Sequence, residues 1–272
     1  MSAVNPGERL VITSQTVMLI ILYLFLYFPI FYITYLSFAS NSVWPFPPEF
    51  TWEWYQRLGI MSDFHAGLRN SLIIGIGSGV VAALFATIAV IGILKYPMRG
   101  RGLLIGIYLS PLFVAQVLIG ISTLMFNRNV LGLPGHIGSA IIANGTYGLS
   151  FAFLVLMAQL LRYDWRLDEV AMVFGARPAR CFFEVTLPSV WPAVLGAFVV
   201  SFLLGFNNFD ISFYNLGAIP TLPTIAWGTL RHGIEPELYA LASIVNALVF
   251  VGLILLYVLI RSGYVRLGVP ED

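Results

Sequence analysis

The chain has 272 residues, of which 59% are hydrophobic and only 10% are charged, and its formal net charge is +1. Soluble domains usually carry about a quarter charged residues, so this composition argues against a soluble protein. The near-neutral charge gives no indication of a nucleic-acid partner. The single cysteine, Cys181, excludes an internal disulfide and a multi-cysteine metal site. The sequence therefore predicts an integral membrane protein.

Six charge-poor stretches are long enough to cross a bilayer, whose hydrocarbon core requires about 20 mainly apolar helical residues. In chain order the predicted spans are 17–38, 70–94, 103–126, 140–161, 191–213 and 240–260. A seventh stretch, 211–230, is interrupted by prolines and glycines, and we interpret it as a loop at membrane level followed by a short helix. The expected fold is all-α, with residues 1–272 forming one six-helix transmembrane domain.

The distribution of basic residues predicts the orientation of these spans. With a cytoplasmic N-terminus, ten of the 14 lysines and arginines lie on the cytoplasmic side, which is the usual bias. Both termini are then cytoplasmic, as is the loop 162–190 between the fourth and fifth spans. The outer segment 41–66 is rich in aromatic residues and proline, as is typical of a membrane interface. The first stretch has no signal cleavage site and is too long for a signal peptide.

The predicted spans contain a signal for close helix packing, but the sequence contains no recognisable catalytic motif. Gly75 and Gly79 lie four residues apart in the second span, a spacing that lets helices approach closely in lipid. Lys95 lacks the glycine spacing of a phosphate-binding loop, and no zinc-binding histidine pair or nucleophilic serine motif is visible. We therefore predict no catalytic residue and no metal ligand. Scarce ionisable residues in the spans argue against an ion-coupled carrier.

The loop 162–190 contains a short amphipathic helix. Asp168 and Glu169 suit its N-terminus, Val170, Val173 and Phe174 form one apolar stripe, and Gly175 can end it. Pro178 is placed to start a second short helix, which Leu187-Pro188 is expected to close before the fifth span. Such an apolar stripe could bind a cytoplasmic partner or lie on the lipid surface, and the local pattern does not separate the two.

The same loop carries a resemblance to a known family. The spacing Glu169-Val170-Ala171 to Gly175, followed by Leu187-Pro188, resembles the EAA motif of permease subunits in binding-protein-dependent ABC importers. The family usually has alanine where this chain has Val170. "NSL" at 70–72 and the position of the motif between spans four and five agree with the resemblance. The segments 187–217 and 234–244 are similar to the second permease subunit of spermidine/putrescine-type systems.

The resemblance implies a type I importer permease in a bacterial inner membrane, with a coupling helix that docks on an ATPase. Implied partners are two ATPase subunits, which bind ATP and Mg²⁺, a second homologous permease in a heterodimer, and an extracytoplasmic solute-binding protein. This chain would then be a translocation subunit without enzymatic activity or a cofactor of its own. The residues implied in ATPase coupling are Asp168, Glu169, Ala171, Phe174, Gly175, Pro178, Leu187 and Pro188.

The candidate substrate pathway lies near the outer end of the fifth span. Asn207, Asn208 and Asp210 are costly to expose to lipid, so they should face protein or water. They could contact solute, bond neighbouring helices or lie in an interfacial loop. Tyr214 and Trp227 are weaker candidates. Asparagines stand where the polyamine subgroup often has an acidic pair, and this departure favours a solute that is smaller or less cationic than spermidine. The expected solute is a small polar compound, such as a polyamine, a related amine or an amino-acid-like molecule. A self-contained secondary transporter or channel is the alternative.

Overall fold

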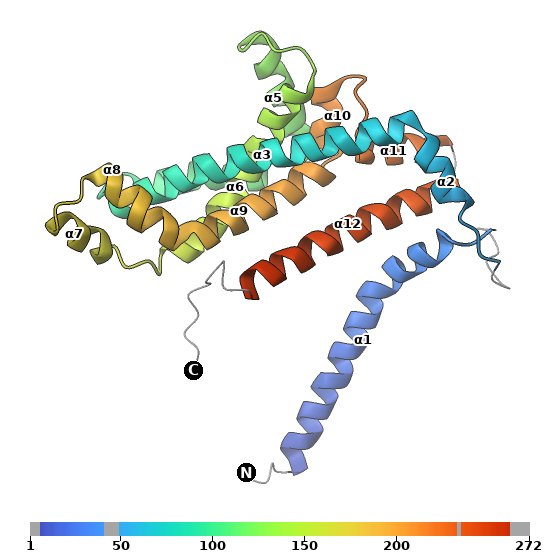
Figure 1. Cartoon of the computed structure of the whole chain (residues 1–272), viewed down its shortest axis with the longest axis horizontal. Helices are drawn as coiled ribbons and strands as arrows, with labels where there is room; N and C mark the ends of the chain where they lie inside the picture. The colour runs from blue at the N-terminus through green and yellow to red at the C-terminus, as the bar shows by residue number, and fades with distance from the viewer. Residues whose placement is uncertain (1–5, 41–48, 233–234, 262–272) are drawn as a thin grey trace. The chain divides into compact units, whose positions relative to one another are not determined.

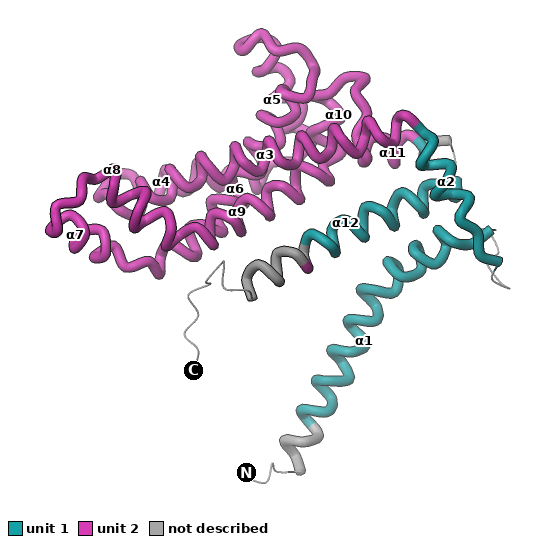
Figure 2. The backbone as a smooth tube through the Cα atoms, in the orientation of Figure 1, with its two compact units in different colours: residues 1–61, 229–252 teal, residues 62–228, 253–272 magenta. Residues whose placement is uncertain are grey.

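The computed structural model describes residues 6–40, 49–232 and 235–261. These residues are helical apart from short connections and an isolated antiparallel bridge between Ala39 and Phe50. The chain divides into two compact units, one of residues 1–61 with 229–252 and one of residues 62–228 with 253–272 (Figure 2). The all-α prediction is confirmed for the described residues.

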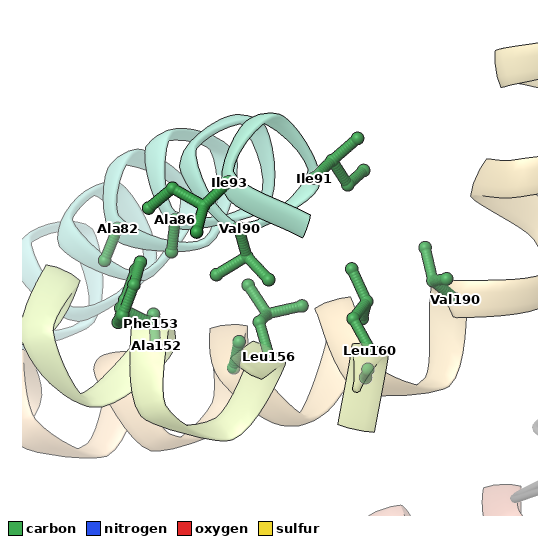
Figure 3. Packing of buried hydrophobic residues seen from close by; sticks show 12 residues of the cluster. Ala82, Ala86, Val90, Ile91, Ile93, Ala152, Phe153, Leu156, Leu160 and Val190 are labelled. Atoms are coloured by element: carbon green, nitrogen blue, oxygen red, sulfur yellow. The ribbon is translucent and has the colours of Figure 1, made fainter. Parts of the chain in front are cut away.

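Three long helices form the centre of the larger unit. Helices α3 (Ser62–Lys95), α6 (Ile137–Leu160) and α9 (Leu187–Asn207) pack along one another (Figure 1). Their shared core combines small and branched side chains, as expected for helices that associate by close packing in lipid (Figure 3). Among its fully buried members are Ala82, Ala86, Val90, Ala152, Phe153, Leu156 and Ala197.

The two glycines of the second predicted span lie in close contact with α9. A Cβ atom at Gly75 would lie 3.0 Å from the ring of Phe202, and one at Gly79 would lie 3.0 Å from the ring of Phe198 and 3.1 Å from its carbonyl oxygen. Larger residues at these positions would separate α3 from α9. The predicted close helix contact is thus confirmed.

The predicted third span, 103–126, is wrong as a single straight helix. Helix α4 (Arg101–Leu109), a 3-10 turn η1 (Ser110–Phe113) and helix α5 (Gln116–Asn129) replace it, with a bend of 109°. Pro111 has no N–H to donate to the carbonyl of Ile107, and the hydroxyl of Ser110 donates to that oxygen instead at 2.8 Å. Val114 then takes extended backbone angles, and α5 leaves in a new direction.

The predicted fifth span, 191–213, is also too long. Helix α9 ends at Asn207, Asn208 has a ψ angle of 116°, and a separate helix α10 (Asp210–Leu216) follows. A turn at Gly217, with φ of 65°, leads to helix α11 (Leu222–His232). The stretch 211–230 is therefore interrupted, as its prolines and glycines predict.

The smaller unit contains α1 (Pro6–Leu36), α2 (Glu53–Ile60) and part of α12 (Pro236–Arg261). The hydroxyls of Ser37 and Tyr55 lie 2.7 Å apart, which joins the end of α1 to α2. Arg57 joins α2 to α12 by pairing with Glu53 at 2.6 Å and Glu237 at 3.0 Å.

Four helices of the described chain are long and apolar enough to cross a membrane, and the bent α4–α5 pair would make a fifth. They correspond to the first five predicted spans. Helix α12 coincides with the sixth, 240–260, although its described apolar part, Pro236–Gly252, is shorter. The structure is that of a multi-pass, all-helical membrane protein.

Candidate functional site

The loop between α6 and α9 folds into the helix pair that the sequence predicts. Helix α7 (Arg166–Val173) carries Asp168 and Glu169 in its first turn, and Gly175 ends it with φ of 89°. The left-handed region costs a residue with a side chain about 1–2 kcal/mol, so glycine suits this turn. Pro178 then begins the short helix α8 (Pro178–Cys181).

Leu187-Pro188 does not close the second helix, and that prediction is wrong. Helix α8 continues through a π turn, η2 (Phe182–Thr186), directly into α9. The N–H of Leu187 bonds to the carbonyl of Phe182, five residues earlier. Pro188 has no N–H to donate. The π turn just before it shifts the backbone hydrogen bonds by one residue, so the helix continues past the proline.

One face of α7 is apolar and uncovered. Val173 is 85% exposed and Phe174 is 87% exposed, and Val170 is also exposed on the same helix. We call these three residues the α7 patch. Glu169 is exposed beside it, whereas Ala171 is half-buried. Large exposed apolar groups with a polar border are typical of interaction surfaces.

Asp168 points the other way, into the protein. Its side chain is only 1% exposed, and it accepts hydrogen bonds from Lys95 Nζ at 2.5 Å, Tyr163 at 2.9 Å and Thr186 at 3.0 Å. Burial alone would raise the pKa of Asp168, but the bonds from Lys95, Tyr163 and Thr186 together lower it. Burial and the bond to Asp168 raise the pKa of Tyr163 to about 12. The carboxylate is therefore ionised and held within the loop.

A second candidate site is a cleft of about 580 Å³ at the junction of α9, α10 and α5. All three principal pathway candidates line it: Asn207 at the end of α9, Asn208 in the connection, and Asp210 at the start of α10. They do not lie on one continuous helix, as the sequence suggests, because α9 ends between them. The remaining lining comes from Gln116, Val200, Leu203, Leu204 and Phe209.

The polar residues of the cleft have different surroundings. Asn208 is buried; its Oδ1 accepts the N–H of Ile211 at 2.7 Å, and its Nδ2 donates to Gln116 Oε1 at 3.2 Å. Gln116 in turn donates to the hydroxyl of Tyr147 at 2.9 Å. Asn208 thus fixes the start of α10, while Asn207 is exposed and Asp210 is half-buried at the cleft.

Tyr214 and Trp227 are not among the residues that line this cleft. Tyr214 packs against Gly120 of α5, and the Trp227 ring lies 5.2 Å from that of Phe209. The sequence reasoning missed Gln116. Its signal is an amide in an otherwise apolar stretch, which indicates a partner inside the bundle.

The sequence of the chain is similar to those of known permeases. No protein-family model matches the chain. It is 28% identical over 261 residues to the putrescine transport system permease protein PotI of Escherichia coli (strain K12), covering 93% of each chain. It is 26% identical over 228 residues to the spermidine/putrescine transport system permease protein PotC of the same strain, covering 84% of this chain and 86% of that one.

The fold is also found in a solved structure. A chain in the crystal structure of a bacterial ABC transporter that imports the acidic polysaccharide alginate superimposes with a TM-score of 0.71 at 18% identity, covering 96% of this chain and 99% of that chain. The chain is a permease subunit of an ABC importer. It is homologous to the putrescine and spermidine/putrescine permeases and acts as a non-catalytic translocation component.

Proposed function

We propose that this permease forms half of an ATP-driven import pathway for a small amine, and that the α7 patch docks on an ATPase subunit. The observation that carries this proposal is the exposure of Val173 and Phe174 at the end of α7, which lies between two membrane helices. Burying one such side chain contributes about 1.5–3 kcal/mol, so a few of them can hold two subunits together. ATP and Mg²⁺ bind to the ATPase, and closure of two ATPase subunits moves the docked α7.

The other partners are a second homologous permease and an extracytoplasmic solute-binding protein. Residues of α5, α9 and α10 and the connection between α9 and α10 line the cleft at Asn207 and Asp210. In this proposal a second permease faces the cleft and completes a polar path. We propose a heterodimer because segments 187–217 and 234–244 resemble the second permease subunit of spermidine/putrescine-type systems, which implies a different first subunit. A solved alginate transporter complex contains a periplasmic protein bound to an alginate pentasaccharide, which supports a binding-protein partner.

The substrate class follows from the cleft and the relatives together. Asp210 places a carboxylate at the cleft, and a carboxylate at membrane depth is stabilised by a cationic solute group. Asn207 adds neutral donors and acceptors. The relatives' names include putrescine and spermidine. We infer a solute with at least one ammonium group and less charge than spermidine, such as putrescine or an amino-acid-like amine.

The functional test uses the permease assembled with its own ATPase, second permease and binding protein in proteoliposomes. Putrescine should stimulate ATP hydrolysis and enter the vesicles only when ATP is present on the ATPase side. The matched control is 1,4-butanediol, which has the same length without charge and should not stimulate ATP hydrolysis. Uptake that persists without ATP and follows an ion gradient would contradict the proposal.

The proposed topology has six spans in one permease domain, 1–272, with both termini and the α7 loop in the cytoplasm of a bacterial cell. A cysteine in place of the exposed Ser62 should react with an impermeant thiol reagent added to intact cells, and one in place of the exposed Ala179 should not. The native Cys181 is buried and provides the unreactive background. The opposite labelling pattern would invert this orientation.

A further inference from the structure

The buried carboxylate of Asp168 joins three parts of the permease that are separate in sequence. Lys95 is the last residue of α3, Tyr163 follows α6, and Thr186 ends the π turn before α9. Their polar atoms lie within 2.5–3.1 Å of the Asp168 carboxylate oxygens. The Lys95 ammonium also lies 5.8 Å from the centre of the Trp165 ring, on the same loop.

The covalent chain already connects α7 to two of the three central helices. It reaches α6 through residues 161–165 and α9 through α8 and the π turn. Helix α3 ends 73 residues before Asp168, and the Lys95–Asp168 ion pair connects it to α7. The pair therefore lies where a displacement of α7 would reach the third helix of the core.

We propose that Lys95 is a positioning residue that makes the end of α3 move with α7 during the transport cycle. This inference rests on the proposed docking of α7 on the ATPase. Separating the two groups would leave a buried carboxylate without its counter-charge, which is strongly unfavourable. The cheaper movement keeps them together, so α7 and the end of α3 shift as one body. Because α3 packs along α6 and α9 through Ala82 and Ala86, its displacement changes the packing of the whole core.

The exposures of the pair fit this role. Lys95 is 24% exposed in its side chain and Asp168 only 1%, so the ammonium retains some water while the carboxylate depends on its protein partners. Removal of the lysine charge therefore weakens the connection between α3 and α7 without opening a large cavity. The three helices of the core would still form, because their packing is apolar.

The experiment compares Lys95→Met and Lys95→Arg in the full reconstituted importer, with the solute moved per ATP hydrolysed as the readout. Lys95→Met should lower this ratio by about tenfold, which corresponds to about 1.4 kcal/mol, while basal ATP hydrolysis continues. Lys95→Arg keeps the charge and should restore most of the ratio. The exposed Arg99, four residues further along, supplies the matched control Arg99→Met, which should behave like the parent.

A second arm covers the case in which Lys95→Met assembles poorly. The double variant Lys95→Met with Asp168→Asn removes both charges, so it leaves no unpaired buried carboxylate. It should assemble better than the single variant and show the same low ratio. A double variant with a parental ratio would overturn the proposal, as would a parental ratio in Lys95→Met or an equal loss in Lys95→Arg.

The same assay separates this inference from the docking on which it rests. Phe174→Asp should uncouple the importer whether or not Lys95 acts on α3. If Phe174→Asp uncouples and Lys95→Met does not, the role of Lys95 is refuted and the docking stands. If Phe174→Asp behaves like the parent, the docking itself is refuted.

Discussion

Phe174→Asp should abolish solute-stimulated ATP hydrolysis and uptake while the permease remains in the membrane at its normal level. Phe174 is 87% exposed, so the change removes almost no packing within the chain. At a docked interface, however, it removes about 1.5–3 kcal/mol of apolar burial and adds a carboxylate that must lose its water. The measurements are uptake, ATP hydrolysis and the amount of inserted permease.

A control variant tests whether the effect is specific to the α7 patch. Tyr96→Asp places the same charge on an exposed aromatic position in the loop after α3, outside the α7 patch, and should leave coupling intact.

Gly175→Val tests whether the turn at Gly175 is needed to orient the α7 patch. No neighbouring atom lies within 4 Å of a Cβ at Gly175, so the penalty comes from its φ of 89° and not from a clash. Gly175→Asn, which tolerates that angle better, should retain more activity. Normal uptake in both Phe174→Asp and Gly175→Val would refute the role of the α7 patch.

Asp210→Asn should reduce uptake of a cationic amine by about tenfold or more, because a hydrogen bond to a charged group contributes about 1.5–3 kcal/mol. The substitution keeps the size of the side chain and removes the charge from the cleft. Asn207→Ala is the matched control, since Asn207 also lines the cleft but carries no charge. It should reduce uptake less. Uptake should be measured in vesicles at two solute concentrations.

Asn208→Ala is expected to act differently from both. Asn208 bonds Ile211 and Gln116, so its loss should disturb the start of α10 and lower the amount of assembled permease. If Asp210→Asn equals the parent at both concentrations, Asp210 is a packing residue and the argument for a cationic solute fails.

The helix pair in the loop 162–190 could be predicted because its signals are local. Gly175 and Pro178 determine backbone angles within a few residues, and the 3.6-residue period places Val170, Val173 and Phe174 on one face. The EAA spacing then connects this local structure to a class of transporter. These features require no knowledge of how distant segments pack.

The broken third span could not be predicted in the same way, because proline is ambiguous in membrane helices. Pro29 and Pro192 lie inside α1 and α9 without ending them, whereas the chain turns soon after Pro111. Neighbouring groups decide whether a helix continues past a proline, and here both the backbone N–H and the hydroxyl of Ser110 donate to the carbonyl of Ile107. A hydropathy pattern contains no such information.

The contacts between residues that are distant in sequence also could not be predicted from local patterns. Gln116 and Asn208 are 92 residues apart, and Lys95 and Asp168 are 73 apart. Asp168 is an ordinary first-turn carboxylate in the sequence, and only the fold shows that it faces inward while Glu169 faces outward. The glycines at 75 and 79 predicted close packing, but not that α9 would supply the phenylalanines they contact.

The most direct test of ATPase docking is a photo-cross-linker attached to a cysteine in place of Val173. This position is 85% exposed on the α7 patch and can report what covers it. In the assembled importer we expect adducts with the ATPase subunit, whose yield changes when ATP closes the ATPase dimer. Adducts with lipid and none with the ATPase, both with and without ATP, would show that α7 lies on the membrane surface and would contradict the account.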